Sequence, residues 1–354
     1  MFTRFKSLFA DNRADESRAL RKQADEHVRN NRLSEATRLY REALATKPDF
    51  EFAHRDLGNV LERLGRPDEA IASYRRAIAI DERMIDAHQY LGNLLLNRGA
   101  TQEAIACYEN IVKLDPGHPI GHLARALSGG DSERAPSEYV QKLFDQYAPN
   151  FDSHLASALR YSDPDKLAAL LRHYRRSEDE KWAVLDLGCG TGLAGAAIAP
   201  FAGKIVGVDL SSNMLQKARA RGLYDRLVQL DLLTMMKAED AAAYDLILAA
   251  DVFVYLGKLD ELVKEAHRLL RVGGLFAFSV ESLEALKPER AGSQRRDYRL
   301  TATARYAHSI DYLSRMAGEN SFDILTTVAN QIRLEKGNSV NGYLAVWRRA
   351  EVAA

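Results

Sequence analysis

The sequence predicts an all-α solenoid of helical repeats followed by a doubly wound α/β domain. In the first third of the chain, apolar and small residues recur with a period of about 34 residues. In the second half, short apolar runs alternate with helical patterns, which is typical of a parallel sheet covered by helices. One of these runs, residues 184–187, leads directly into three glycines at alternate positions, Gly188, Gly190 and Gly192.

Composition limits the classes of function. The 354 residues suffice for two or three domains, and a hydrophobic content of 46% can fill their cores. Lys plus Arg and Asp plus Glu both number 49, which argues against general affinity for nucleic acid or membrane surfaces. The two cysteines, Cys107 and Cys189, lie in different predicted domains, so neither a disulfide framework nor a cysteine-based zinc site is expected. With no signal peptide or membrane span in the sequence, we expect a cytoplasmic protein without a metal.

Three repeated blocks fill the first third of the chain. Small residues stand where two helices of one repeat would cross, and a tyrosine follows at a constant spacing, where we expect it in the gap to the next repeat. This pattern resembles tetratricopeptide repeats over residues 17–118. The repeated positions are Gly58, Ala70 and Tyr74, then Gly92, Ala104 and Tyr108, with Ala36 and Tyr40 in a more degenerate first block.

The resemblance to these repeats implies a concave groove lined by the first helix of each repeat. Asn59 and Asn93 stand one repeat apart, and paired amides at that spacing could hold the backbone of an extended peptide or protein partner. A solvated polar face is the alternative. The side chains expected to face the groove are Arg21, Asp25, Arg55, Asn59, Arg63, Gln89, Asn93 and Asn97.

Four segments are expected from these patterns. Residues 1–16 form an N-terminal arm, and residues 17–130 form three repeats with a cap helix. Residues 131–179 form a connector with helices that cover the site, and residues 180–354 form the α/β domain.

The spacing of the glycine turn limits the class of ligand that this site is expected to bind. A strand, a glycine turn and a helix place backbone N–H groups and a positive helix end against a ligand. Leu193 stands where a dinucleotide-binding G-x-G-x-x-G pattern has its third glycine, which disfavours a nicotinamide-dependent oxidoreductase. The string D-L-G-C-G-T-G, which begins at Asp186, resembles the first motif of class I S-adenosylmethionine-dependent methyltransferases. The resemblance implies a Rossmann-like sheet of seven strands with an antiparallel last strand. It also implies that Asp186 helps to hold the amino group of the cofactor.

Further cofactor positions follow the next strands. Asp209 ends the strand at 204–208, at the distance from the turn where a carboxylate takes ribose hydroxyls. The resemblance implies that Asp231 and Leu232 hold the adenine, although a helix cap is the alternative for Asp231. Met214 is placed to flank the adenine. The resulting site for S-adenosyl-L-methionine comprises Asp186, Gly188, Gly190, Gly192, Asp209, Leu210, Met214, Asp231, Leu232 and Ala250, with Tyr147 and Phe151 of the connector.

The connector contains the string F-D-x-Y-A-x-x-F-D at residues 144–152. It is similar to the segment just before the core of many small-molecule class I methyltransferases, where aromatic residues fold over the cofactor. Tyr147 and Phe151 would then shield the sulfonium, since an aromatic face beside a cation is favourable. The alternative is that the rings only pack the connector onto the domain.

The last part of the chain carries the candidate catalytic residues. Asp251 and Tyr255 follow the strand at 244–250, and open α/β sheets bind ligands at that edge. His308 has the most useful intrinsic pKa for a base, with a cap or packing role as its alternative. Asp251 is equally placed to touch the cofactor. The supporting groups are Glu281, Arg305 and Tyr306, and the other elements expected are a strand at 275–281, a surface loop at 283–300, a helix opening at 305–309, and antiparallel strands at 322–328 and 341–348.

We therefore expect a methyltransferase that acts on an oxygen or nitrogen nucleophile of an unidentified small molecule or protein. The repeats would serve as a protein-interaction or docking module, and no nucleic acid or membrane partner is expected. The whole chain resembles a bacterial group of methyltransferases that carry tetratricopeptide repeats. The alternative function is a repeat scaffold whose methyltransferase-like domain binds the cofactor but is catalytically inert.

Overall fold

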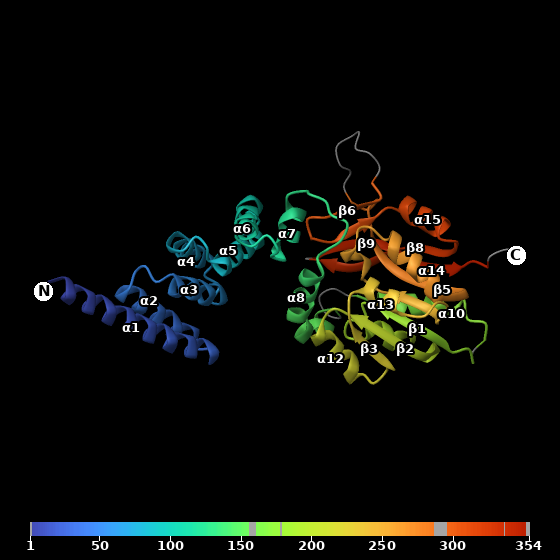
Figure 1. The fold of residues 1–354 in the computed structure, drawn as a ribbon, viewed down its shortest axis with the longest axis horizontal. Helices are drawn as coiled ribbons and strands as arrows, with labels where there is room; N and C mark the ends of the chain where they lie inside the picture. Colours follow the sequence, from blue (N-terminus) through green and yellow to red (C-terminus); the bar gives the residue numbers. More distant parts are fainter. Residues whose placement is uncertain (1, 156–160, 178, 287–295, 336, 352–354) are drawn as a thin grey trace. The chain divides into compact units, whose positions relative to one another are not determined.

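The computed structural model describes residues 2–155, 161–177, 179–286, 296–335 and 337–351. The chain divides into two compact units, Met1–Ser128 and Gly129–Ala354 (Figure 1). Among the described helices, none combines the length and the apolar content that crossing a bilayer requires.

The first unit consists of consecutive helices that pack in pairs. Each pair is one repeat, and the residues expected as an N-terminal arm are the first part of a long opening helix. The helices are α1 (Phe2–Arg29), α2 (Leu33–Thr46), α3 (Glu51–Arg63), α4 (Pro67–Ile80), α5 (Ile85–Asn97), α6 (Thr101–Leu114) and α7 (Ile120–Leu127). The helix α7 packs on α6 and covers the last repeat.

In the second and third repeats, the tyrosine of the second helix packs on a glycine of the first helix. A Cβ added to Gly58 would lie 2.5 Å from the Tyr74 ring, and one added to Gly92 would lie 2.5 Å from the Tyr108 ring. The Tyr74 ring also lies 5.9 Å from the ring of Tyr90 in the next repeat. The tyrosines therefore fill space within their own repeats as well as the gap to the next repeat that the sequence predicts.

Several of the expected groove side chains already bind other side chains of the repeats. The Oδ1 atoms of Asn59 and Asn93 accept hydrogen bonds from tyrosine hydroxyls of their own repeats, at 2.7 and 2.9 Å. Asp56 accepts from Arg21 at 2.6 Å and pairs with Arg55 at 2.7 Å. The two amides thus already stabilise the helix pairs, and a peptide would have to use their N–H groups.

Gly92→Ala is expected to lower the free energy of unfolding of the repeats by about 1 kcal/mol. The added methyl group forces the buried Tyr108 ring to move, at a cost of roughly 1–3 kcal/mol, which exceeds the helix-propensity gain of about 1 kcal/mol. Urea unfolding followed by circular dichroism measures the change. Gly117→Ala is the control, because its Cβ would lie 3.6 Å from the nearest heavy atom, Asp115 Oδ1. Equal stability of Gly92→Ala and the wild type would contradict the expectation.

The second unit is a mixed sheet with helices on both faces. The strands are β1 (Trp182–Leu187), β2 (Ala202–Asp209), β3 (Arg226–Gln229), β4 (Tyr244–Ala249), β5 (Leu270–Ser282), β6 (Tyr298–Leu300), β7 (Tyr306–His308), β8 (Phe322–Glu335) and β9 (Asn338–Arg349). The helices are α8 (Ser137–Tyr147), α9 (Phe151–His154), α10 (Asp163–Arg172), α11 (Leu193–Ile198), α12 (Ser212–Ala220), α13 (Leu232–Ala238), α14 (Asp260–Leu269) and α15 (Ile310–Glu319).

The strand order confirms the predicted fold class. The sheet runs β3-β2-β1-β4-β5-β7-β6, with β1 to β5 parallel to their neighbours. The last two strands form the expected antiparallel pair, and β9 also pairs antiparallel with β5. Alternate residues of β1 enter two cores. Leu185 and Leu187 pack with α13, α14 and α15, whereas Trp182 and Val184 pack with α10 and α11.

Two short strands differ from the prediction. β6 lies in the segment expected as a surface loop, and β7 lies where a helix was expected to open. β7 pairs with β5 at Glu281 and Ser282, beyond the point where β4 ends. The helix α15 begins only after Ser309, whose hydroxyl accepts a hydrogen bond from the Tyr312 N–H at 3.1 Å. This pairing is long-range, so local periodicity did not indicate it.

Candidate active site

The glycine turn after β1 forms one wall of a pocket. Gly188, Gly190 and Gly192 have φ values of 62°, 53° and 87°, in the left-handed region that favours glycine. A Cβ on Gly188 would lie 2.6 Å from Val252. A Cβ on Gly190 would meet nothing closer than a backbone oxygen at 4.0 Å, and this residue lines the pocket. A side chain at residue 190 would therefore project into the space that a ligand needs.

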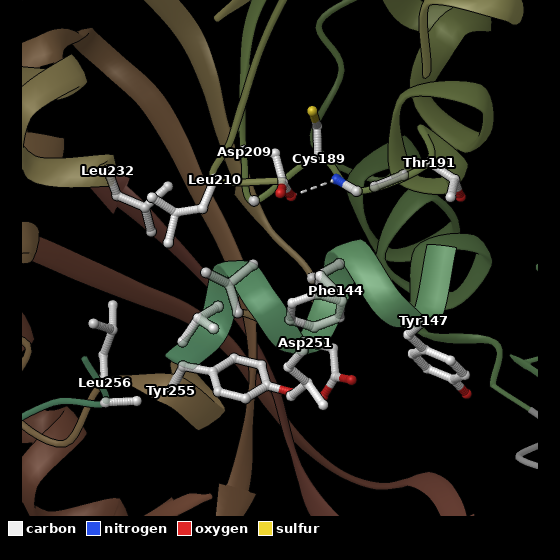
Figure 2. A pocket seen from close by; sticks show the side chains of 18 of the residues that line it. Phe144, Tyr147, Cys189, Thr191, Asp209, Leu210, Leu232, Asp251, Tyr255 and Leu256 are labelled. Carbon is white, nitrogen blue, oxygen red and sulfur yellow. Dashed lines mark hydrogen bonds between the residues drawn. The ribbon is translucent and has the colours of Figure 1, made fainter. Parts of the chain in front are cut away.

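Asp209, at the end of β2, is held against this turn. One carboxylate oxygen accepts from the Gly190 N–H at 2.9 Å (Figure 2). The other accepts from the Ser211 N–H at 2.8 Å. Burial raises the pKa of Asp209, and these backbone hydrogen bonds oppose that rise. The carboxylate is fixed in position at the edge of the pocket before any ligand arrives.

The pocket lies at the carboxyl ends of the parallel strands and is covered by α8 and α9. Most of the residues expected to hold the cofactor line it together, although they come from separate segments of the chain. These are Tyr147, Phe151, Gly188, Gly190, Asp209, Leu210, Asp231, Leu232 and Ala250, with the candidate catalytic residues Asp251 and Tyr255.

Asp186, Gly192 and Met214 do not line this pocket, and their predicted contacts with the cofactor need correction. Asp186 is 1% exposed and accepts a hydrogen bond from the Tyr224 hydroxyl at 2.7 Å. Burial raises the pKa of Asp186 to about 7. The Tyr224 ring also covers Gly192, and Met214 is buried in α12. Asp186 and Tyr224 therefore support the glycine turn from the side away from the pocket.

Comparisons with known proteins match both units. A family profile described as a methyltransferase domain matches residues 185–278, and two tetratricopeptide repeat profiles match residues 21–84 and 61–127. This chain carries tetratricopeptide repeats and a methyltransferase domain. The methyltransferase profile spans the strands β1 to β5 that carry the glycine turn, Asp209 and Asp231.

Several individual relatives are methyltransferases that match part of the chain. The chain is 30% identical over 147 residues to malonyl-[acyl-carrier protein] O-methyltransferase of Enterobacter lignolyticus, covering 42% of this chain and 55% of that protein. It is 29% identical over 167 residues to demethylmenaquinone methyltransferase of Symbiobacterium thermophilum, covering 44% and 63%. The chain thus spans less than two thirds of either relative. The structure of magnesium protoporphyrin IX methyltransferase from Synechocystis with bound S-adenosylhomocysteine is similar, with 14% identity, a TM-score of 0.45, and coverage of 61% and 100%.

His308 lies outside the pocket of the methyltransferase domain, so its assignment as the base is wrong. It is fully buried on β7, and its Nε2 lies 3.0 Å from the Gly257 carbonyl oxygen. Its ring stacks on Tyr312 with a centroid distance of 6.1 Å. Burial lowers the pKa of His308 to about 4. The packing alternative holds for this residue, because β7 places it in the interior.

His308→Ala is expected to lower the free energy of unfolding by about 3 kcal/mol without weakening cofactor binding, because a buried ring is lost. The wild type should lose stability as the pH falls from 6.5 towards 4. In this range the His308 side chain is protonated in the unfolded chain but stays neutral in the folded one. The variant should lose less in that range. Calorimetric unfolding at several pH values measures both effects. A variant with normal stability and weakened cofactor binding would contradict this reassignment.

A buried ionic cluster lies beside the catalytic candidates of the methyltransferase domain. Arg333 on β8 is 1% exposed and donates to Asp251 at 3.0 Å, to Glu335 at 2.9 Å, and to Glu281. Arg305 also pairs with Glu335. Burial raises the pKa of Glu281, and the charge of Arg333 opposes this rise. Asp251, Arg305 and Arg333 line the pocket, so one carboxylate and two guanidinium groups of this cluster border it.

Asp251 and Tyr255 lie on the wall opposite Asp209 (Figure 2). Asp251 has a φ of 57°, and its N–H donates to the Ser279 hydroxyl at 2.8 Å, which fixes the turn after β4. Tyr255 is 8% exposed, and burial raises the pKa of its hydroxyl. On this wall, the carboxylate can accept a hydrogen bond from a nucleophile, and the neutral hydroxyl can donate one to it.

Sequence reasoning missed Phe144 and Arg333 as parts of the site. The Phe144 ring lies 6.0 Å from Phe151 and 5.5 Å from Tyr255, and the Tyr147 ring lies 5.1 Å from Phe151. The spacing of Phe144, Tyr147 and Phe151 puts them on one helical face, so this pattern could have revealed the first ring. Arg333 had no such signal, because only the return of β8 to the sheet brings it to the pocket.

Proposed function

We propose that the methyltransferase domain transfers a methyl group from S-adenosyl-L-methionine to an oxygen or nitrogen nucleophile of a small molecule or protein. The observation that carries this proposal is the pocket itself. It brings Gly190, Asp209, Asp231 and Ala250 together at the carboxyl ends of four adjacent strands. The bound sulfonium supplies a methyl carbon already activated for displacement. The chain then has to hold the cofactor, align the nucleophile and exclude water.

The cofactor side rests on two carboxylates. Asp209 offers two fixed oxygens to a pair of vicinal hydroxyls, which is the pattern expected for ribose. Asp231 caps α13 by accepting from the Leu233 and Thr234 N–H groups at 3.2 and 3.4 Å, all through Oδ1. Its Oδ2 lies 3.4 Å from the Ser137 hydroxyl, on the pocket side. The cap and the proposed adenine contact therefore use different oxygens of one side chain.

The acceptor side rests on Asp251 and Tyr255. Arg333 binds Oδ1 of Asp251 and so fixes the carboxylate, which in our proposal orients the nucleophile and takes up its proton. The Tyr255 hydroxyl positions the same group. The rings of Phe144, Tyr147 and Phe151 cover the pocket and exclude water from the reacting atoms.

The first unit is proposed to act as a protein-interaction or docking module. On α3, the Phe52 side chain is 41% exposed, and the guanidinium carbons of Arg21 and Arg55 lie 5.5 Å from its ring centroid. An exposed ring beside two cations offers a contact surface to an aromatic or acidic segment of a partner or acceptor.

Two measurements on the full chain test the proposed activity. Calorimetry should detect binding of S-adenosyl-L-methionine, and incubation with cell extract should release S-adenosylhomocysteine at a rate that depends on the extract. Binding of S-adenosyl-L-methionine without release of S-adenosylhomocysteine in the presence of any extract or acceptor library would favour the inert scaffold instead. No binding of the cofactor would refute the proposal.

A further inference from the structure

The segment formed by α8, the turn η1 (Ala148–Asn150) and α9 covers the pocket and carries two aspartates. Phe144, Tyr147 and Phe151 line the pocket, whereas Asp145 and Asp152 bind loops of the domain. The two aspartates are seven residues apart, with Asp145 in α8 and Asp152 in α9, on either side of η1. We call residues 137–154 the covering segment.

Asp145 binds the loop that follows Asp209. Its Oδ1 accepts a hydrogen bond from the Ser211 hydroxyl at 2.6 Å. Ser211 also caps α12, because its Oγ accepts from the Met214 N–H at 3.1 Å. The side-chain amide of Asn213 donates to the Asp145 carbonyl oxygen at 3.0 Å. The covering segment is thus tied to the loop that orients the proposed ribose carboxylate.

Asp152 binds the glycine turn. Its Oδ1 accepts from the Thr191 hydroxyl, and its Oδ2 pairs with Arg221 Nη2 at 2.8 Å. Arg221 Nε in turn donates to the Thr191 carbonyl oxygen at 2.6 Å. The covering segment is therefore also tied to the turn that contains Gly190, which lies next to the Asp209 loop.

We propose that Asp145 and Asp152 are positioning residues that hold the covering segment closed over the cofactor and set how slowly it is released. This inference rests on the proposed function. In this proposal, a ligand under residues 144–151 is released when the covering segment moves, because its rings line the pocket on that side. Movement of the segment requires its contacts with the domain to break, and the two aspartates supply one side-chain tie to each of two neighbouring loops. Weaker contacts join Ser137 to Asp231 at 3.4 Å and Lys217 to the Pro149 carbonyl oxygen at 3.1 Å.

The strength of each tie is moderate. The side chains of Asp152 and Arg221 are 38% and 30% exposed, so water screens their attraction. A partly exposed hydrogen-bonded pair of this kind contributes about threefold to an equilibrium or rate. The two ties use separate partners, so their effects should multiply to about tenfold. Such a cover stays closed around a ligand yet opens often enough for turnover.

The test compares wild type, Asp145→Ala, Asp152→Ala and the double variant, with S-adenosylhomocysteine as the probe. Stopped-flow displacement of the bound probe measures its release. We expect release about threefold faster in each single variant and about tenfold faster in the double variant. Hydrogen exchange of residues 137–154 in the ligand-free chain should also become faster, with an unchanged unfolding temperature of the domain.

Two further variants separate positioning from general stability. Glu138→Ala removes an acid from the same helix, where it pairs with Lys142 at 2.9 Å, and should leave release unchanged. Exchanging the charges in Asp152→Arg with Arg221→Asp should restore part of the slow release by restoring the attraction between the two positions.

Two results would overturn this inference without affecting the proposed function. One is wild-type release rates in the double variant, and the other is faster hydrogen exchange without faster release. A wild-type chain that fails to bind S-adenosylhomocysteine would instead overturn the proposed function and this inference with it. If the wild type binds S-adenosylhomocysteine normally, the release rates of the variants test only the role of the two aspartates.

Discussion

Asp209→Ala is expected to weaken binding of S-adenosyl-L-methionine by at least about 100-fold. The substitution removes two charge-assisted hydrogen bonds to a proposed ribose, each contributing about 1.5–3 kcal/mol. It also frees the Gly190 and Ser211 N–H groups, which the carboxylate holds at 2.9 and 2.8 Å. Isothermal titration calorimetry measures the change in affinity.

Two comparisons make this result specific. Asp323→Ala removes an exposed acid from β8 and should bind the cofactor as the wild type does. The circular dichroism of Asp209→Ala should show that the repeats remain folded, because the substitution lies in the other unit. Undiminished binding by Asp209→Ala would count decisively against the proposed ribose site.

Arg333→Met is expected to lower the free energy of unfolding of the methyltransferase domain by about 3–5 kcal/mol. The change leaves buried carboxylates without their shared cation, and breaking a buried ion pair from one side costs this much. The affected groups are Asp251, Glu281 and Glu335, of which Glu281 is 5% exposed. Calorimetric unfolding at neutral pH measures the loss.

The matched control is Arg315→Met. Arg315 pairs with Asp297 at 2.6 Å, but both side chains are nearly half exposed, at 47% and 45%. A surface pair of this kind contributes about 0–1 kcal/mol. The destabilisation of Arg333→Met should also shrink at acidic pH, where protonation neutralises the stranded carboxylates. A loss no larger than that of the control would show that the cluster is not needed for stability.

The repeats and the parallel strands could be predicted because local patterns specify them. The period of the repeats places Gly58 and Gly92 under tyrosines sixteen residues later, and the structure has both contacts. The glycine turn requires positive φ at alternate positions, which glycine adopts without strain. Asp209 could be located because a carboxylate at the end of a second parallel strand necessarily comes to the same sheet edge as the turn.

The wrong or missing assignments concern residues whose surroundings come from distant parts of the chain. His308 had a suitable intrinsic pKa, but pairing of β7 with β5 buries it away from the pocket. Asp186 lies just before the turn, but its carboxylate accepts a hydrogen bond from the Tyr224 hydroxyl. Asp145 and Asp152 were part of a recognised string, yet their partners lie about 40–70 residues away, as hydrogen-bonded pairs with separations of 39 and 66 residues show.

The order of residues alone thus established the repeat architecture, the class of sheet and the position of the glycine turn beside Asp209. These features depend on residue spacing within one or two neighbouring elements, and this spacing can be read directly from the sequence. The choice of Asp251 over His308 as the proposed proton acceptor, the buried Arg333 cluster and the ties of the covering segment emerged only from the folded domain. Burial and partner choice at those residues depend on strands and loops that meet through long-range packing, and no local spacing encodes such a meeting.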